Sequence, residues 1–344
     1  GWVGPSGYQG HFYGNGYTIT GLKLDKTVGD CGLFTTLGNG ATLENFTLEV
    51  ATVPNFDGIT FPDRTGSAHF GGVLGYVPTG ATLTLKNIRV IGRLDYGPMN
   101  IDGFILAGAL IGETGPGTNI TIENCVSEID ITLAEGLAPG GQTLGFGGIV
   151  GKAYGTMTIK NSYYTGNITL AHNGNKNLSA GGIIGIPNNC TLTIENCYSS
   201  GLITATNDGA TLRRVFVGGL VGWIETRADL VVVKNSAALG ARAVAATNTT
   251  YFCSNRITAG NATTFGTGFG NNFALKNMLT GSDPNATAQD VPGDADTESG
   301  LGKTLNEFKT QTTWTNSVSS GGLGFDSAIW DFSGLQQGKW PTLK

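Results

Sequence analysis

The chain has 344 residues, of which 40% are hydrophobic, 13% are charged and 56 are glycine. Disordered chains of this length carry far more charge, and collagen needs a G-X-Y period that is absent here, so both classes are excluded. The formal net charge is −5 and no Lys/Arg cluster occurs, so we expect no nucleic-acid partner. No apolar run approaches the roughly 18 residues of a transmembrane helix, and the first residues lack a signal-peptide pattern.

A recurring glycine motif is the main signal for the fold. Six segments carry two apolar residues, in most copies between two glycines, and from Gly75 onwards the last glycines recur every 34 to 39 residues. A period of this size is typical of solenoids, propellers and arrays. The segments are 32–35 (the weakest copy), 72–75, 109–112, 148–151, 182–185 and 219–222.

Each glycine motif is followed by a segment that ends in asparagine. The alternation in Thr191-Leu192-Thr193-Ile194 has a period of two, which indicates β-strands rather than helices. Asparagine at a strand end can adopt the left-handed conformation and bond to nearby backbone, so stacked copies predict an internal ladder. The ladder residues are Asn45, Asn87, Asn124, Asn161, Asn196 and Asn235, with Leu275-Lys276-Asn277 as a seventh copy.

These repeats predict an all-β fold, a right-handed parallel β-helix (β-solenoid) of about seven repeats. A propeller is disfavoured because each blade needs four strands and a signature that the chain lacks. Neighbouring rungs lie about 4.8 Å apart, where opposite charges attract, so alternating charges support direct stacking. The residue before each asparagine alternates in this way up to the break at Lys276: Glu44, Lys86, Glu123, Lys160, Glu195 and Lys234.

The repeats resemble a known family. Gly219-Leu220-Val221-Gly222 and the pattern from Ile194 to Gly201 are similar to the GLUG motif repeats of bacterial cell-surface proteins. Residues 14–22 resemble the opening rung of such arrays, and residues 323–343 resemble their closing segment. The resemblance implies either an adhesin or an appendage of a secreted IgA-cleaving metalloprotease. The His-Glu-x-x-His zinc motif of those proteases is absent from this chain.

Two regions follow from this pattern. Residues 1–280 form the predicted β-helix repeat array, and residues 281–344 form an acidic loop and a C-terminal cap closing the solenoid. Open solenoid ends expose strand edges and core, so an aromatic-rich cap is expected. We interpret Trp314, Trp330 and Trp340 as structural residues of this cap, with a ligand platform as the alternative.

Motifs for catalysis or metal binding are scarce. His11, His69 and His172 occupy unlike repeat positions, so we expect surface or turn histidines and neither a histidine metal site nor a Ser-His-Asp triad. Cys125 and Cys197 share the position after the ladder asparagine, which predicts buried free thiols. A disulfide between Cys197 and a nearby cysteine, Cys190, is the alternative.

Carboxylates need separate attention because many parallel β-helices act on polysaccharides. A hydrolase needs two carboxyls about 5 to 9 Å apart, and a lyase needs a base with a neutralising cation. Glu123, Glu128 and Asp130 are the candidates, and the alternation in 128–130 predicts two acids on one outward face. That face is either half of a catalytic site or an ordinary solvent-exposed face of a strand. The acidic residues 290–298 are interpreted as a loop, with a hard-cation site as the alternative.

The excursion over residues 51–69 is rich in apolar and planar side chains. Loops that vary between regular rungs are where solenoids carry function, and exposed aromatics beside a cation suit a sugar or a protein partner. We therefore expect Phe56, Phe61 and Arg64 to contact a ligand. In the alternative, the two phenylalanines fold back to cover the helix flank.

The sequence thus predicts a non-catalytic, surface-exposed adhesin or ligand-binding module that recognises a glycan or a host or matrix protein. A polysaccharide lyase or glycoside hydrolase on the same scaffold is the alternative, because the fold does not choose between them. No cofactor is expected. We expect the chain at the outer surface of a bacterium or outside the cell, as a monomer or as part of a larger surface protein.

Overall fold

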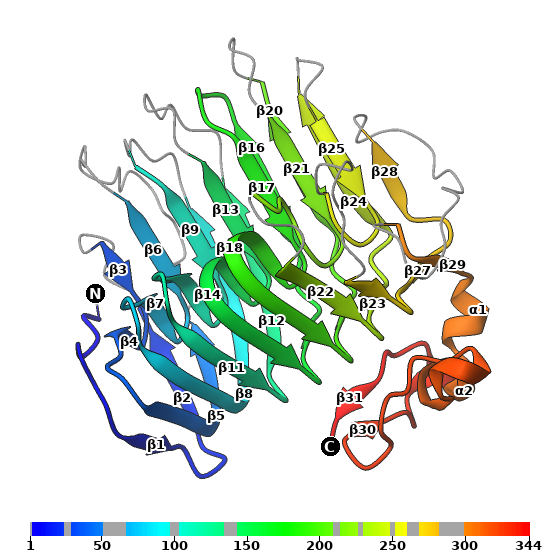
Figure 1. Ribbon diagram of the computed structural model, residues 1–344, viewed down its shortest axis with the longest axis horizontal. Helices are drawn as coiled ribbons and strands as arrows, with labels where there is room; N and C mark the ends of the chain where they lie inside the picture. Colours follow the sequence, from blue (N-terminus) through cyan, green and yellow to red (C-terminus); the bar gives the residue numbers. More distant parts are fainter. Residues whose placement is uncertain are drawn as a thin grey trace.

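The computed structural model of the chain is nearly all β and forms a parallel β-solenoid, which confirms the predicted fold class (Figure 1). The structure describes residues 2–23, 29–50, 67–96, 103–133, 143–208, 214–225, 230–247, 252–259, 268–281 and 299–344. Coils stack side by side from the N-terminal end. The C-terminal segment, in orange and red, folds back below the later coils.

One wall of the solenoid is a seven-stranded parallel sheet that takes one strand from each coil. The solenoid has about five turns, somewhat fewer than the seven repeats expected. The strands of this sheet are β3 (Asp30–Cys31), β6 (Ala68–Gly71), β9 (Ile105–Gly108), β13 (Leu144–Gly147), β17 (Leu178–Gly181), β21 (Val215–Gly218) and β25 (Phe252–Asn255).

The remaining walls belong to a 22-stranded sheet that wraps around the axis. Its strands are β1 (His11–Tyr13), β2 (Thr18–Leu22), β4 (Phe34–Thr36), β5 (Ala41–Val50), β7 (Leu74–Val77), β8 (Thr82–Tyr96), β10 (Ile111–Thr114), β11 (Asn119–Glu123), β12 (Val126–Leu133), β14 (Val150–Lys160), β15 (Tyr163–Tyr164), β16 (Ile168–His172), β18 (Ile184–Glu195), β19 (Tyr198–Ser199), β20 (Ile203–Asn207), β22 (Val231–Lys234), β23 (Ala237–Ala238), β24 (Arg242–Thr247), β26 (Phe269–Gly270), β27 (Phe273–Leu275), β28 (Leu279–Gly281) and β29 (Leu301–Lys303).

The core is a set of apolar columns parallel to the axis. Because strand side chains alternate between faces and the register is preserved from coil to coil, the same repeat position points inward in every coil. One column is fully buried and pairs in register across six coils: Leu43, Leu85, Ile122, Ile159, Ile194 and Val233.

The glycine motif lies where the chain passes from the seven-stranded sheet into the next wall. Neighbouring coils approach closely here, and a Cβ atom on Gly151 would lie 2.5 Å from the carbonyl oxygen of Gly112. A Cβ on Gly185 would lie 2.6 Å from the carbonyl oxygen of Gly151. The motif therefore recurs because only glycine permits this backbone contact.

The cysteines are free thiols, as predicted, and Cys125, Cys190 and Cys197 are buried. Burial raises the pKa of each of these three thiols to about 12. The Cys125 thiol donates to the carbonyl oxygen of Glu123 at 3.3 Å, and the Cys197 thiol donates to that of Glu195 at 3.2 Å. Both thiols thus fill the inside of the corner that follows each ladder asparagine.

The C-terminal segment is built from α1 (Leu305–Phe308), α2 (Gln311–Thr315), two 3₁₀ turns (Val318–Ser320 and Leu335–Gln337) and the hairpin of β30 (Trp330–Asp331) and β31 (Thr342–Leu343). Its buried Trp314 and Trp330 pack along the flank of successive coils, where they cover an outward-facing apolar column that is buried as a result. The column consists of Val126, Tyr163, Tyr198, Ala237 and Phe273.

Candidate functional site

The asparagine ladder is continuous and longer than the sequence indicated. Asn15 and Asn271 extend it, and all eight residues have φ between 47° and 58°, in the left-handed region that asparagine tolerates. The backbone N–H groups of Gly14 and Gly16 donate to Glu44 and Asn45, which places Asn15 beside Asn45. The other six members are Asn45, Asn87, Asn124, Asn161, Asn196 and Asn235.

The predicted seventh copy at Lys276-Asn277 is wrong. Lys234 pairs in register with Gly270, and the Asn271 amide donates to the Asn235 oxygen at 3.0 Å. The strand β27, which contains Leu275, pairs with β23 and so lies one strand further along the coil. Leu275-Lys276-Asn277 therefore resembles the earlier copies in sequence but does not occupy the ladder position.

The ladder lies at a surface corner and not inside the solenoid as predicted. Its side chains are partly exposed for five members, Asn15 and Asn87 are exposed, and Asn161 is buried. The preceding and following inward positions, such as Ile122 and Cys125, fill the core, so the asparagine itself turns outward. In the N-terminal part of the ladder, neighbouring carboxamides bond along the axis: Asn87 donates to Asn45 at 2.8 Å, and Asn124 donates to Asn87 at 3.2 Å.

The charged column beside the ladder stacks in register, as the alternation indicated. Glu195 lies between Lys160 at 3.0 Å and Lys234 at 3.1 Å. Burial by itself would raise the pKa of Glu195, but the hydrogen bonds and charges of the two lysines outweigh it and lower that pKa. Lys86 pairs with Glu123 at 3.5 Å, so Glu123 belongs to this column.

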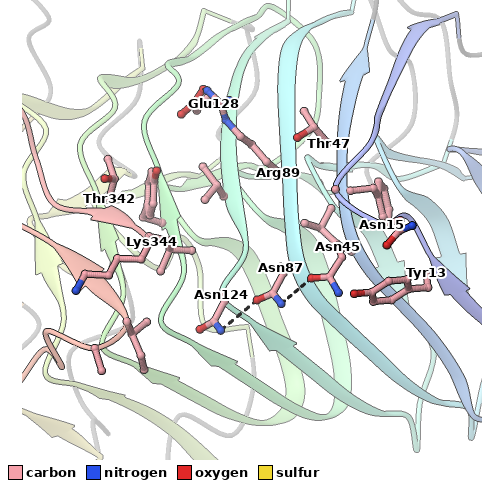
Figure 2. A pocket seen from close by; sticks show the side chains of 18 residues that line it. Tyr13, Asn15, Asn45, Thr47, Asn87, Arg89, Asn124, Glu128, Thr342 and Lys344 are labelled. Carbon is pink, nitrogen blue, oxygen red and sulfur yellow. Dashed lines mark hydrogen bonds and ion pairs between the residues drawn. The ribbon is translucent and has the colours of Figure 1, made fainter.

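A groove of about 850 Å³ lies where the coils of the N-terminal half meet the C-terminal segment (Figure 2). Its floor carries the ladder amides of Asn45, Asn87 and Asn124, and β31 contributes the opposite wall. The groove forms here because the flank column changes from Val126, which the C-terminal segment covers, to the polar Arg89 and Thr47 in the earlier coils. The covering segment therefore ends where the column becomes polar.

The polar groups of the groove include two cations, Arg89 and Lys344, and one carboxylate, Glu128. The Arg89 guanidinium pairs with the Glu128 carboxylate at 2.5 Å. Tyr13 is 56% exposed at one end, and Tyr163 lies at the other. Burial, together with the charge of Glu128, raises the pKa of Tyr163 to about 12, so its hydroxyl is a neutral donor and acceptor.

The sequence-predicted site residues fall in different places. Glu128 and Asp130 do lie on one outward face with Ile129 buried, as predicted, but only Glu128 lines the groove. Asp130 instead accepts a hydrogen bond from the Asn167 backbone at 2.8 Å.

Several predicted residues cannot be placed. The predicted ligand residues Phe56, Phe61 and Arg64 lie outside the described residues, and so does the acidic stretch 290–298. Among the residues that the structure describes, no group of three His, Cys, Asp or Glu side chains could hold a metal ion, and no helix is long and apolar enough to cross a membrane.

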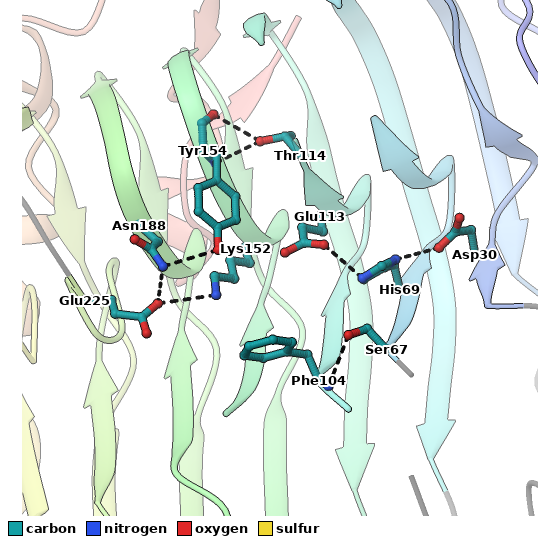
Figure 3. Close-up of polar contacts among 10 residues, drawn as sticks. All are labelled: Asp30, Ser67, His69, Phe104, Glu113, Thr114, Lys152, Tyr154, Asn188 and Glu225. Atoms are coloured by element: carbon teal, nitrogen blue, oxygen red, sulfur yellow. Dashed lines mark hydrogen bonds and ion pairs between the residues drawn. The ribbon is translucent and has the colours of Figure 1, made fainter. Parts of the chain in front are cut away.

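A second polar cluster lies along the seam between the seven-stranded sheet, which contains β6 and β9, and the wall that contains β7, β10 and the start of β14 (Figure 3). His69 bonds to Asp30 at 2.5 Å through Nδ1 and to Glu113 at 2.8 Å through Nε2, and it stacks on Tyr76. We call these three charged residues the His69 bridge. The expectation of an ordinary surface or turn histidine is therefore wrong for His69. It is also wrong for His172, which is buried and whose pKa burial lowers to about 4.

Further along the same seam, Lys152 is the centre of a contact set. Its side chain is only 1% exposed, and its ammonium lies 3.3 Å from Glu225 and 4.4 Å from the centre of the Phe104 ring. Asn188 donates to the same Glu225 oxygen at 2.5 Å and to the Tyr154 hydroxyl at 3.3 Å. Tyr154, Asn188 and Glu225 occupy the same repeat position, three residues after the last glycine of the motif, in successive coils. Sequence analysis missed the set because the residue type changes at this position from coil to coil.

Comparisons with known proteins add no family. No protein-family model matches the chain, and neither a curated protein nor a solved structure is detectably similar to it.

Proposed function

We propose that the chain is a non-catalytic, surface-exposed binding module of the adhesin type and that it binds a glycan in the groove beside the asparagine ladder. The observation that carries this proposal is the row of carboxamides on the groove floor, flanked by tyrosines at its ends. The resemblance to GLUG repeats supports a place at the outer surface of a bacterium. A host or matrix protein is the other partner class that such a surface would serve.

The ladder amides match the hydrogen-bonding pattern of sugar hydroxyls. A carboxamide has two N–H donors and two acceptor lone pairs, and the bonds along the ladder use one donor and one lone pair of Asn87. The remaining donor and lone pair are free to exchange hydrogen bonds with a hydroxyl group, which both donates and accepts. The exposed ring of Tyr13 adds a flat apolar face with a polar tip.

The acid content of the groove supports binding rather than hydrolysis. Among the described residues that line it, Glu128 is the only acidic side chain, and it is paired with Arg89. A glycoside hydrolase of the common type needs a second carboxyl across the groove. The Arg89–Glu128 pair instead offers oriented donors and acceptors whose charges largely cancel.

The proposal can be tested on a glycan and matrix-protein array probed with the labelled chain. Tyr13→Ala and Arg89→Ala should each weaken binding by about tenfold, which corresponds to about 1.4 kcal/mol. Tyr17→Ala is the matched control, because Tyr17 is 73% exposed but does not line the groove.

Two results would contradict the proposal. Equal losses for Tyr13→Ala and Tyr17→Ala would show that the groove is not the binding surface. Release of reducing ends or unsaturated sugars from a polysaccharide, abolished by Glu128→Gln, would identify a lyase or a hydrolase instead. Both assays use the same chain, so one set of preparations separates binding from catalysis.

A further inference from the structure

Lys152, Asn188 and Glu225 bring an amine, a carboxamide and a carboxylate together in the seam. Lys152 lies on β14 and Asn188 on β18, the neighbouring strand of the next coil, and Glu225 comes from the coil after that. The Lys152 Nζ atom lies 3.3 Å from Glu225 Oε2, and the Asn188 Nδ2 atom donates to the same oxygen at 2.5 Å. The amine and the carboxamide are therefore neighbours that share one carboxylate oxygen (Figure 3).

The surroundings of this set restrict water. The Lys152 side chain is almost completely buried, and its Nζ lies over the rings of Phe104 and Tyr154, at 4.4 Å and 5.1 Å from their centres. The Tyr154 hydroxyl accepts a second hydrogen bond from Asn188 Nδ2, at 3.3 Å. Both N–H groups of the Asn188 amide are thus directed at fixed acceptors, which orients the carbonyl carbon.

We propose that Lys152 and Asn188 form an intramolecular amide cross-link between neighbouring coils, with Glu225 as the proton-transfer group. Glu225 takes a proton from the Lys152 ammonium, and the freed amine attacks Asn188 Cγ while the carbonyl electron pair moves to Oδ1. Glu225 then returns its proton to Nδ2 and accepts the second Nζ proton. The C=O bond re-forms, the Cγ–Nδ2 bond breaks and ammonia leaves, taking up the proton from Glu225.

The reaction balances without any other reactant. One ammonium and one carboxamide give one secondary amide and one ammonium ion, and no atom is oxidised or reduced. Proximity favours the reaction, because the amine and the carboxamide are held against a common carboxylate and the step is therefore intramolecular. Tyr154 is a positioning residue in this scheme, since its hydroxyl accepts from the leaving nitrogen and its ring lies beside the Lys152 ammonium.

Intact-mass measurement of the whole chain tests the proposal directly. The wild-type chain should be lighter than its sequence by the mass of one ammonia molecule, and protease digestion should give one branched peptide that joins the segments around Lys152 and Asn188. Lys152→Arg, Asn188→Ala and Glu225→Gln should each have the full mass of their own sequences. Lys160→Arg, a change in the exposed ion pair with Glu195, is the matched control and should keep the mass loss.

Two outcomes would overturn the cross-link. A wild-type chain at the full sequence mass after prolonged incubation shows that the bond does not form. Loss of ammonia without a branched peptide shows a succinimide at some asparagine rather than an amide to Lys152. Both readings come from the wild-type chain, so they do not depend on whether a variant folds.

Discussion

The His69 bridge should make the stability of the solenoid depend on pH. Burial alone lowers the pKa of His69, but the hydrogen bonds and negative charges of Asp30 and Glu113 outweigh it and raise the pKa from 6.5 to about 9. A shift of this size corresponds to about 3 kcal/mol, because one pKa unit is about 1.4 kcal/mol. The folded chain binds this proton more tightly than the unfolded chain does. The contribution is therefore fully present below pH 6.5 and is lost as the pH rises through 9.

Urea unfolding of the wild-type chain and of His69→Gln, from about pH 6 to about pH 10, measures this contribution. Glutamine keeps a hydrogen-bonding side chain between the carboxylates but does not titrate, so groups elsewhere affect both proteins equally. The difference in unfolding free energy should shrink by about 3 kcal/mol across this range. A difference that stays constant with pH would refute the reasoning, because it would mean that folding does not raise the pKa of His69.

Four other changes test separate parts of the structure. Asn161→Leu should lower the free energy of unfolding by about 1–3 kcal/mol because leucine is strained at a φ of 47°, whereas Asn161→Gly should change it much less. Equal losses for the two variants in urea unfolding would contradict this. Ile194→Ala should cost about 2–5 kcal/mol in the same assay, since it opens a cavity in a fully buried column, and a loss below about 1 kcal/mol would mean that the coils are not closely packed. Tyr198→Phe should lower the free energy of unfolding by about 1 kcal/mol and speed proteolysis of the C-terminal segment, because the Tyr198 hydroxyl donates to the Pro341 carbonyl at 2.5 Å. Unchanged proteolysis would mean that this hydrogen bond does not hold the segment in place. Deleting residues 51–66, the part of the excursion before β6, should leave the melting temperature nearly unchanged but abolish attachment, and a large loss of stability would show that this excursion only covers the flank.

The repeated features of the fold could be predicted from the sequence because each coil is related to the next by a translation along the solenoid axis. Each coil repeats the last at a fixed rung spacing, so a side chain in one repeat position meets the same position in the next coil. This rule gave the solenoid, the register of the charged column from Glu44 to Lys234, and the left-handed asparagines. The same rule failed at Asn277, where a similar tripeptide lies on a different wall, because a local pattern does not say which strand of the coil carries it.

The candidate sites depend on contacts between unlike repeat positions, which periodicity cannot supply. The groove exists because the C-terminal segment folds back onto the apolar flank column and ends where Arg89 replaces Val126. Lys152 and Glu225 lie on the same wall two coils apart, and they meet because the long lysine side chain reaches past the coil that carries Asn188. Such contacts between side chains depend on how the chain bends between strands and on how far each side chain reaches. The sequence alone therefore determined the stacked architecture, whereas the tertiary packing of unlike elements decided which polar side chains come together.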